Sequence, residues 1–177
     1  EDITYEGTGA GGIAIIVRTL TDNRNRTAPS MRHIFSTYWG NLWETGSVSN
    51  YLYEYRGQIT LRTPSDFESF ELALLETEAQ DYEKSGDTTI IWTDRTNLAS
   101  VKKSLEWAGY TIESSNFAYI PKNYSEVTDF DTALKVYSFL EAASEDEDIE
   151  AVWNNAEISD DLWEKCREKV EASRFRT

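Results

Sequence analysis

Apolar side chains recur along this chain at two spacings, one typical of buried strands and the other of amphipathic helices. The first apolar run, 13–17, is short and rich in β-branched residues, so it predicts a buried strand. A helix should follow, with Thr27 as its N-cap, Pro29 in its first turn and Gly40-Asn41 at its end. Its core stripe has the i, i+3, i+4 and i+7 spacing of one helix face and consists of Met31, Ile34, Phe35 and Tyr38.

The remaining chain alternates between the same two patterns. Strands are expected over 47–55, 58–63, 81–84, 88–93, 111–114, 116–120 and 149–153. Helices are expected after the capping box 65–68, after Asn97, across 130–140 and after Ser159. Arg56-Gly57 is interpreted as a tight turn between two strands, and the acidic segment 145–148 as a solvated bend.

This order of elements predicts an α+β fold made of two α/β sandwich domains, with the second inserted into the first. Each domain would place two helices on one face of an antiparallel sheet. The expected domains are a discontinuous one, 1–56 plus 116–158, and an inserted one, 57–115. Residues 159–177 are expected to form a C-terminal helical extension.

Composition narrows the function classes. The net charge of −15 argues against non-specific wrapping of DNA, which needs many cations facing phosphates. One cysteine, Cys166, and one histidine, His33, predict neither a disulfide framework nor a metal site, and no cofactor is expected. No apolar run is long enough to span a bilayer, so a membrane partner is not expected. The chain has no recognisable catalytic pair or phosphate loop, so it is not expected to be an enzyme.

Against this acidity, the stretch 18–33 is a basic island, where four arginines against Asp22 give a charge of about +3. Its arginines and asparagines flank a predicted helix N-terminus, where free N–H groups and the helix dipole favour phosphate. Arginine also binds phosphate oxygens through paired hydrogen bonds. The candidate nucleic-acid-binding residues are Asn23, Arg24, Asn25, Arg26, Arg32, His33 and Asn41.

Other interpretations of these residues stay open. Arg24 and Arg26 could form surface ion pairs with Asp22 or Glu44, and the asparagines could simply form turns. His33, beside an apolar stripe, could be a packed, hydrogen-bonded histidine.

A second candidate surface combines glycines with tryptophans. A glycine-rich loop can approach an RNA backbone closely because it lacks side chains. The candidate partner-contacting residues are Gly7, Gly9, Gly11, Gly12, Trp39 and Trp43. The glycines could instead make a tight connection with positive φ values, and the tryptophans could lie in a core or a domain interface.

Several motifs occur in one order: Glu6-Gly7-Thr8-Gly9-Ala10-Gly11-Gly12, then 21–27, 32–35, 40–42 and 46–48. Together they resemble the YebC/PmpR family, whose mitochondrial relatives are translational activators of cytochrome c oxidase. The resemblance implies two ferredoxin-like domains, one inserted in the other, preceded by a helical domain that this sequence lacks. The chain departs from the family at Trp39 and Trp43, where glycine is usual, and at Thr8 and Ala10, where tyrosine and proline are usual.

The resemblance implies a translation factor that docks on the ribosomal RNA of the large subunit through the Asn/Arg loop and the glycine loop. One alternative is a DNA-binding transcriptional regulator, although no helix carries the dense basic face that major-groove recognition needs. Another is a structural subunit of a ribosome or other ribonucleoprotein, held by neighbouring protein subunits. The bacterial cytoplasm or the mitochondrial matrix is the expected location.

Overall fold

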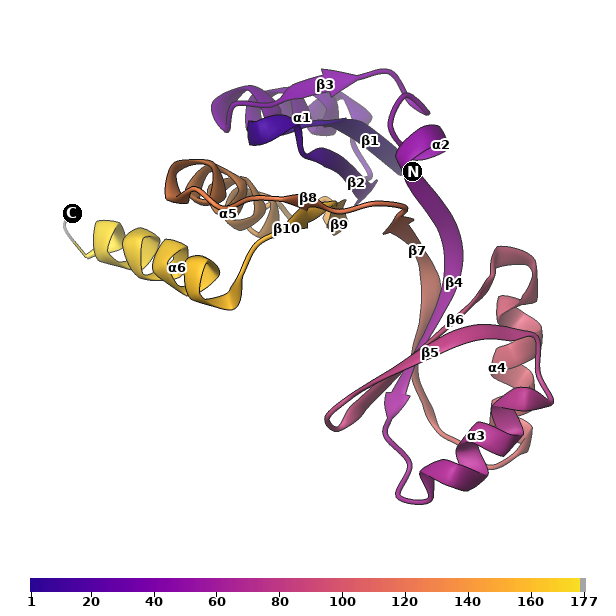
Figure 1. Cartoon of the computed structure of the whole chain (residues 1–177). Helices are drawn as coiled ribbons and strands as arrows, with labels where there is room; N and C mark the ends of the chain where they lie inside the picture. The colour runs from indigo at the N-terminus through magenta and orange to yellow at the C-terminus, as the bar shows by residue number, and fades with distance from the viewer. Residues whose placement is uncertain (176–177) are drawn as a thin grey trace. The chain divides into compact units, whose positions relative to one another are not determined.

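The computed structural model describes residues 1–175 and divides into two compact units (Figure 1). Unit 1 comprises Glu1–Glu54 together with the chain from Pro121 onward, and unit 2 comprises Tyr55–Ile120. The inserted unit therefore begins at Tyr55 instead of residue 57 and ends at Ile120 instead of residue 115. None of the described helices is both long and apolar enough to cross a membrane.

Unit 1 is built on a four-stranded sheet in the order β3-β1-β2-β9, and each neighbouring pair is antiparallel. The strands are β1 (Asp2–Thr8), β2 (Ala14–Leu20), β3 (Asn41–Trp43) and β9 (Ile149–Asn154). The long helices are α1 (Arg24–Thr37), α5 (Phe130–Ser144) and α6 (Asp160–Arg174). Shorter elements are η1 (Ala10–Gly12), α2 (Ser49–Leu52), and the parallel pair β8 (Ser125–Glu126) and β10 (Ala156–Glu157).

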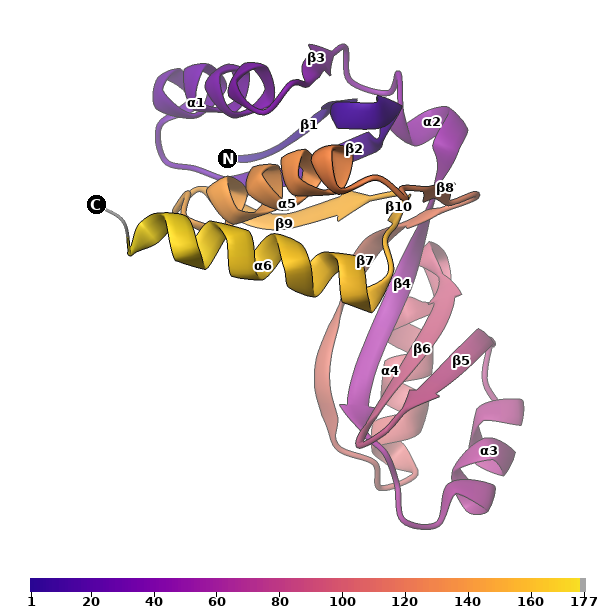
Figure 2. The same cartoon turned by 60° about the vertical axis from the view of Figure 1, so that its left-hand side comes forward.

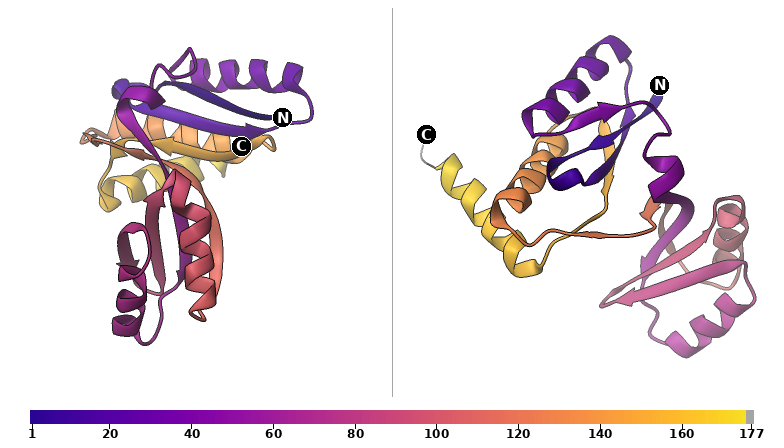
Figure 3. Two further views of the ribbon diagram at one scale, coloured as in Figure 1. Left: turned by 90° about the vertical axis from the view of Figure 1, so that its right-hand side faces the viewer. Right: turned by 45° about the horizontal axis from the view of Figure 1, so that its top comes forward.

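The core of unit 1 joins both of its chain segments. Ile15 of β2 and Met31 of α1 are fully buried with Phe139 of α5 and Cys166 of α6. Phe35 of α1 meets Phe139 edge to face, with ring centroids 4.9 Å apart. Figures 2 and 3 show α6 beside α5, so the predicted C-terminal extension packs on unit 1.

Unit 2 has the element order strand–helix–strand–strand–helix–strand and the sheet order β5-β6-β4-β7, which is the ferredoxin-like arrangement. Its elements are β4 (Tyr53–Arg62), α3 (Phe67–Leu75), β5 (Ala79–Ser85), β6 (Thr88–Asp94), η2 (Arg95–Asn97), α4 (Leu98–Trp107) and β7 (Ile112–Pro121). Figure 1 shows α3 and α4 on one side of this sheet. Between them and the strands lies an apolar core that includes Ile59, Phe70, Ile91 and Leu105.

Predictions that rest on local side-chain patterns are confirmed in several elements. Met31, Ile34 and Phe35 are buried on the inner face of α1. Ser159 caps α6 by accepting a hydrogen bond from the N–H of Leu162. The strands expected over 81–84 and 88–93 also form, as the antiparallel pair β5 and β6.

Other local predictions are wrong. Residues 47–52 form a turn and α2 rather than a strand, and the two strands expected over 111–120 are one, β7. Arg56-Gly57 lies inside β4 and is no turn. Gly57 is needed there for close packing, because a Cβ atom would collide with the Thr93 side chain. The strand β1 was not predicted, since its buried positions include the polar Glu6.

The end of α1 contains an unusual backbone conformation. Trp39 has a φ of +63° and is the one non-glycine residue with positive φ in the part of the chain that the structure describes. The N–H of Gly40 donates to the carbonyl oxygen of Phe35 at 2.7 Å, which completes a Schellman motif with Trp39 at its left-handed position. The Lys135 ammonium lies 4.8 Å from the Trp39 ring centroid and favours this placement of the indole.

We expect Trp39→Gly to be more stable than Trp39→Ala by about 1 kcal/mol, because only glycine adopts the left-handed conformation without strain. Both substitutions remove the contact with Lys135, so the difference between their free energies of unfolding reports the backbone conformation at residue 39. Urea unfolding of the two variants measures it, and Lys135→Ala measures the cation–π contact separately. Equal stability of the two variants would show that the backbone at residue 39 is not strained.

Candidate nucleic-acid interface

Four of the candidate residues, Asn23 to Arg26, lie at the start of α1, which begins at Arg24 with Asn23 as its N-cap. Arg32 and His33 lie further along the helix, and Asn41 begins β3. The Asn23 side chain accepts a hydrogen bond from the N–H of Arg26 at 3.3 Å. Thr27, the expected cap, lies inside the helix with its side chain buried. The prediction was wrong because Asn23 and Thr27 both suit a cap, and Thr27 has buried partners that local sequence does not reveal.

The main partner of this helix start is Asp148, which is only 8% exposed. Its carboxylate accepts hydrogen bonds from Arg26 Nη2 at 2.7 Å, Arg26 Nε at 3.1 Å and Thr27 Oγ1 at 2.8 Å. These bonds hold the pKa of Asp148 below its usual range, and the bond to Asp148 raises the pKa of Arg26. The expected solvated bend at 145–148 is therefore wrong for Asp148, which joins α1 to the strand β9.

Two further carboxylates, those of Asp22 and Glu1, offset the positive charge of the basic island. Arg26 Nη2 also lies 3.2 Å from the Asp22 carboxylate, so the alternative interpretation of Arg26 as the partner of Asp22 in an ion pair is confirmed. Arg24 Nη1 lies 3.8 Å from the carboxylate of Glu1, not of Glu44. The local charge of the folded site is thus lower than that of the sequence segment, because carboxylates from distant positions face it.

The outward face of α1 keeps the remaining candidates accessible. Asn25, Arg32 and His33 are exposed and lie opposite the buried stripe of the helix. Arg32 forms no ion pair with any residue that the structure describes. The interpretation of His33 as a packed core histidine is wrong.

The glycines of 7–12 divide into two groups. Gly7 is buried within β1, and a Cβ atom there would collide with the carbonyl oxygen of Asn41 and the ring of Phe35. Gly9 also packs closely, because its Cβ would lie 2.7 Å from Ile15. Gly11 and Gly12 are exposed and have positive φ values of 70° and 75°. Only the last two are open to a partner.

Trp39 and Trp43 do not belong to a core, so the interpretation of them as core residues is wrong. Their exposed fractions are 59% and 53%, respectively. The Trp43 indole N–H donates to Thr8 Oγ1 at 3.0 Å, which orients the ring at the edge strand β3. Both rings are thus fixed in position yet open to a stacking partner.

Sequence reasoning missed one residue that organises this surface. Glu6 is 2% exposed, and its carboxylate accepts hydrogen bonds from the N–H groups of Gly46, Val48 and Ser49 at 2.7, 3.1 and 2.6 Å. It therefore holds the segment that follows β3. The only available signal was a glutamate beside a glycine motif, because its partners lie about forty residues further along the chain.

The described residues contain no cluster of three or more histidine, cysteine, aspartate or glutamate side chains suited to a metal ion. What the arrangement offers is a helix face with exposed Asn, Arg and His side chains. Fold and site together define a two-unit α+β protein with a small polar and cationic surface on unit 1.

Comparison with known proteins identifies the family. Residues 1–156 match the family model described as the second and third domain of TACO1/YebC. The chain is 39% identical over 168 residues to a probable transcriptional regulatory protein of Methylacidiphilum infernorum, covering 94% of this chain and 67% of the relative. It is 38% identical over 173 residues to one of Thermotoga maritima, covering 97% and 67%. The chain therefore belongs to the TACO1/YebC family, and it spans about two thirds of the length of these relatives.

A solved structure confirms the fold. A conserved hypothetical protein of Aquifex aeolicus superposes with a TM-score of 0.81 at 38% sequence identity. The match covers 90% of this chain and 66% of that protein. The prediction of a two-domain α+β fold of the YebC type is thereby confirmed.

We expect Asp148→Asn to lower the free energy of unfolding near neutral pH. Because folding lowers the pKa of Asp148, its contribution is present above the unfolded pKa of about 3.9 and is lost as the pH falls through the folded value. The difference between wild type and variant should therefore shrink below about pH 4. Urea unfolding across a pH series measures this difference.

Asp22→Asn is the matched control, since Asp22 contacts the same Arg26 but its side chain is 92% exposed. It should change stability little, because exposed ion pairs contribute little. Equal effects of the two substitutions would contradict a special role for the buried carboxylate.

Proposed function

We propose that this chain is the nucleic-acid-contacting part of a regulator of gene expression, and that the outward face of α1 makes the contact. The observation that carries the proposal is Arg32, which is exposed and has no ion-pair partner among the described residues although the chain is strongly acidic. An unpaired cation on such a surface is available to a phosphate. Asn25 and His33 on the same face add hydrogen-bonding groups.

Duplex DNA is the first candidate target, because the relatives carry names of transcriptional regulators. The acidity of the chain limits general affinity for DNA, so binding would rest on a few phosphate contacts and be sensitive to salt. Such binding suits a protein that reaches its site through one focused surface.

Ribosomal RNA of the large subunit is the second candidate, and the small number of cations favours it. The α1 surface offers Arg24, Arg26 and Arg32, and the first two face carboxylates. This is fewer cations than dense major-groove recognition of a duplex uses. Structured RNA is recognised by shape and phosphates, and its unpaired bases stack on aromatic rings such as the exposed Trp39 and Trp43.

We expect Arg32→Ala to weaken nucleic-acid binding and to reduce the slope of log affinity against log salt by about 0.9, the effect of one lost phosphate contact on duplex DNA. The measurement is binding to duplex DNA and to purified large ribosomal subunits over the same salt series. Arg62→Ala is the matched control, because Arg62 is an exposed arginine of unit 2 that also has no ion-pair partner in the described chain.

The pattern of results separates the candidates. Salt-sensitive binding to DNA that Arg32→Ala weakens supports transcriptional regulation, whereas the same behaviour on ribosomal subunits alone supports a role in translation. Binding that Arg32→Ala and Arg62→Ala reduce equally would remove α1 as the contact surface. Absence of binding to either target at low salt would contradict the proposal.

A further inference from the structure

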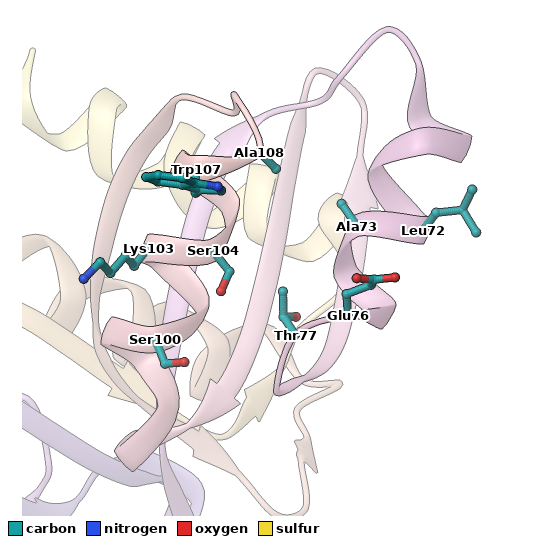
Figure 4. Close-up of a pocket in the computed structure, with 9 residues that line it drawn as sticks. All are labelled: Leu72, Ala73, Glu76, Thr77, Ser100, Lys103, Ser104, Trp107 and Ala108. Carbon is teal, nitrogen blue, oxygen red and sulfur yellow. The ribbon is translucent and has the colours of Figure 1, made fainter.

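Unit 2 carries an open groove of about 710 Å³ between α3 and α4 (Figure 4). Small side chains face the space between the two helices, as Figure 4 shows for Ala73 on α3, Ser104 on α4 and Ala108 directly after α4. Because these side chains are short, the groove can admit side chains of another molecule.

Large apolar side chains stand at its margins. Trp107, on α4, is 91% exposed, and Leu72, on α3, is 61% exposed. Exposed apolar side chains therefore stand on both helices at the groove, and apolar side chains exposed together mark interaction sites.

The groove also carries opposite charges on its two walls. Glu76 lies at the end of α3, and Lys103 lies on α4. Neither forms an ion pair with any residue in the part of the chain that the structure describes. The groove therefore presents one unpaired acidic side chain and one unpaired basic side chain. It also combines a concave space with protruding apolar side chains of a kind that could occupy such a space.

We propose that this groove binds the same groove of a second copy of the chain across a two-fold axis. In a two-fold contact each surface meets itself, so it must carry both members of every complementary pair. The groove meets this requirement in charge, since Glu76 of one copy can face Lys103 of the other and the reverse pair forms by symmetry. It meets the requirement in shape as well, because Trp107 of each copy can enter the space lined by small side chains on the other. An unrelated partner would need no such self-complementarity.

The size of the surface sets the strength of the dimer. Helices of nine and ten residues are about 15 Å long, so the face they share is smaller than the roughly 800 Å² per partner buried in standard stable complexes. The dimer is accordingly weak and dependent on protein concentration, with a dissociation constant on the order of 10 to 100 μM.

Sedimentation velocity of the 177-residue chain over a concentration series up to about 0.5 mM tests the proposal. The expected result is a monomer–dimer equilibrium that Trp107→Ala weakens about tenfold or more. Trp43→Ala, which removes another exposed tryptophan on unit 1, should leave the equilibrium unchanged. Circular dichroism confirms that both variants remain folded.

A charge exchange makes the test specific for the two-fold contact. Glu76→Lys and Lys103→Glu each place like charges together twice and should each weaken the dimer, whereas the double variant should restore it. A monomer at every concentration would overturn the proposal and leave the groove to a different protein. A dimer that is insensitive to Trp107→Ala and to the charge exchange would overturn it too, because the copies would then meet elsewhere.

Discussion

One buried carboxylate, that of Asp148, links the two chain segments that make up unit 1. Asp148 follows the inserted unit in the chain, yet it accepts hydrogen bonds from Arg26 and Thr27, which precede the insertion. The backbone at the same residue pairs as well, since the carbonyl oxygen of Asp148 accepts from the N–H of Leu20 at 2.8 Å. A buried carboxylate requires such partners, because an unpaired charge away from water is costly. Meeting that requirement brings the start of α1 and the start of β9 together and so closes a unit made of two chain segments.

The same interaction changes the meaning of the basic island. Sequence alone makes Arg26 a natural phosphate ligand, because it stands among arginines and asparagines at a helix start. In the folded protein its guanidinium is bonded to a carboxylate from the other chain segment, and it serves structure first. The outward face of α1 is therefore the better candidate for contact with nucleic acid, because Arg32 on that face has no ion-pair partner among the described residues. Charge within a sequence window is a poor guide wherever the fold brings distant carboxylates to it.

The parts that could be predicted from sequence are those that local spacing decides. The stripe of Met31, Ile34 and Phe35, the cap of Ser159 and the antiparallel pair β5 and β6 follow from short-range patterns. The parts that could not be predicted depend on contacts between distant positions. Glu6 and its donors are separated by 40 to 43 residues, and Arg26 and Asp148 by 122. The turn predicted at Gly57 is wrong for the same reason. The glycine is required because the Thr93 side chain, on another strand, leaves no room for a Cβ atom.

The insertion also imposes an order on the assembly of the chain as it is synthesised. Unit 2 is one continuous segment, so every residue that it needs has been made once Ile120 is added. Unit 1 cannot complete its sheet until β9 and Asp148 have been made, and until then β2 lacks one of its two neighbouring strands. The first segment of unit 1 is made before unit 2, so part of its apolar surface stays uncovered while unit 2 becomes able to fold. Synthesis of unit 1 therefore begins before that of unit 2, yet unit 2 is the first of the two that can complete its folding.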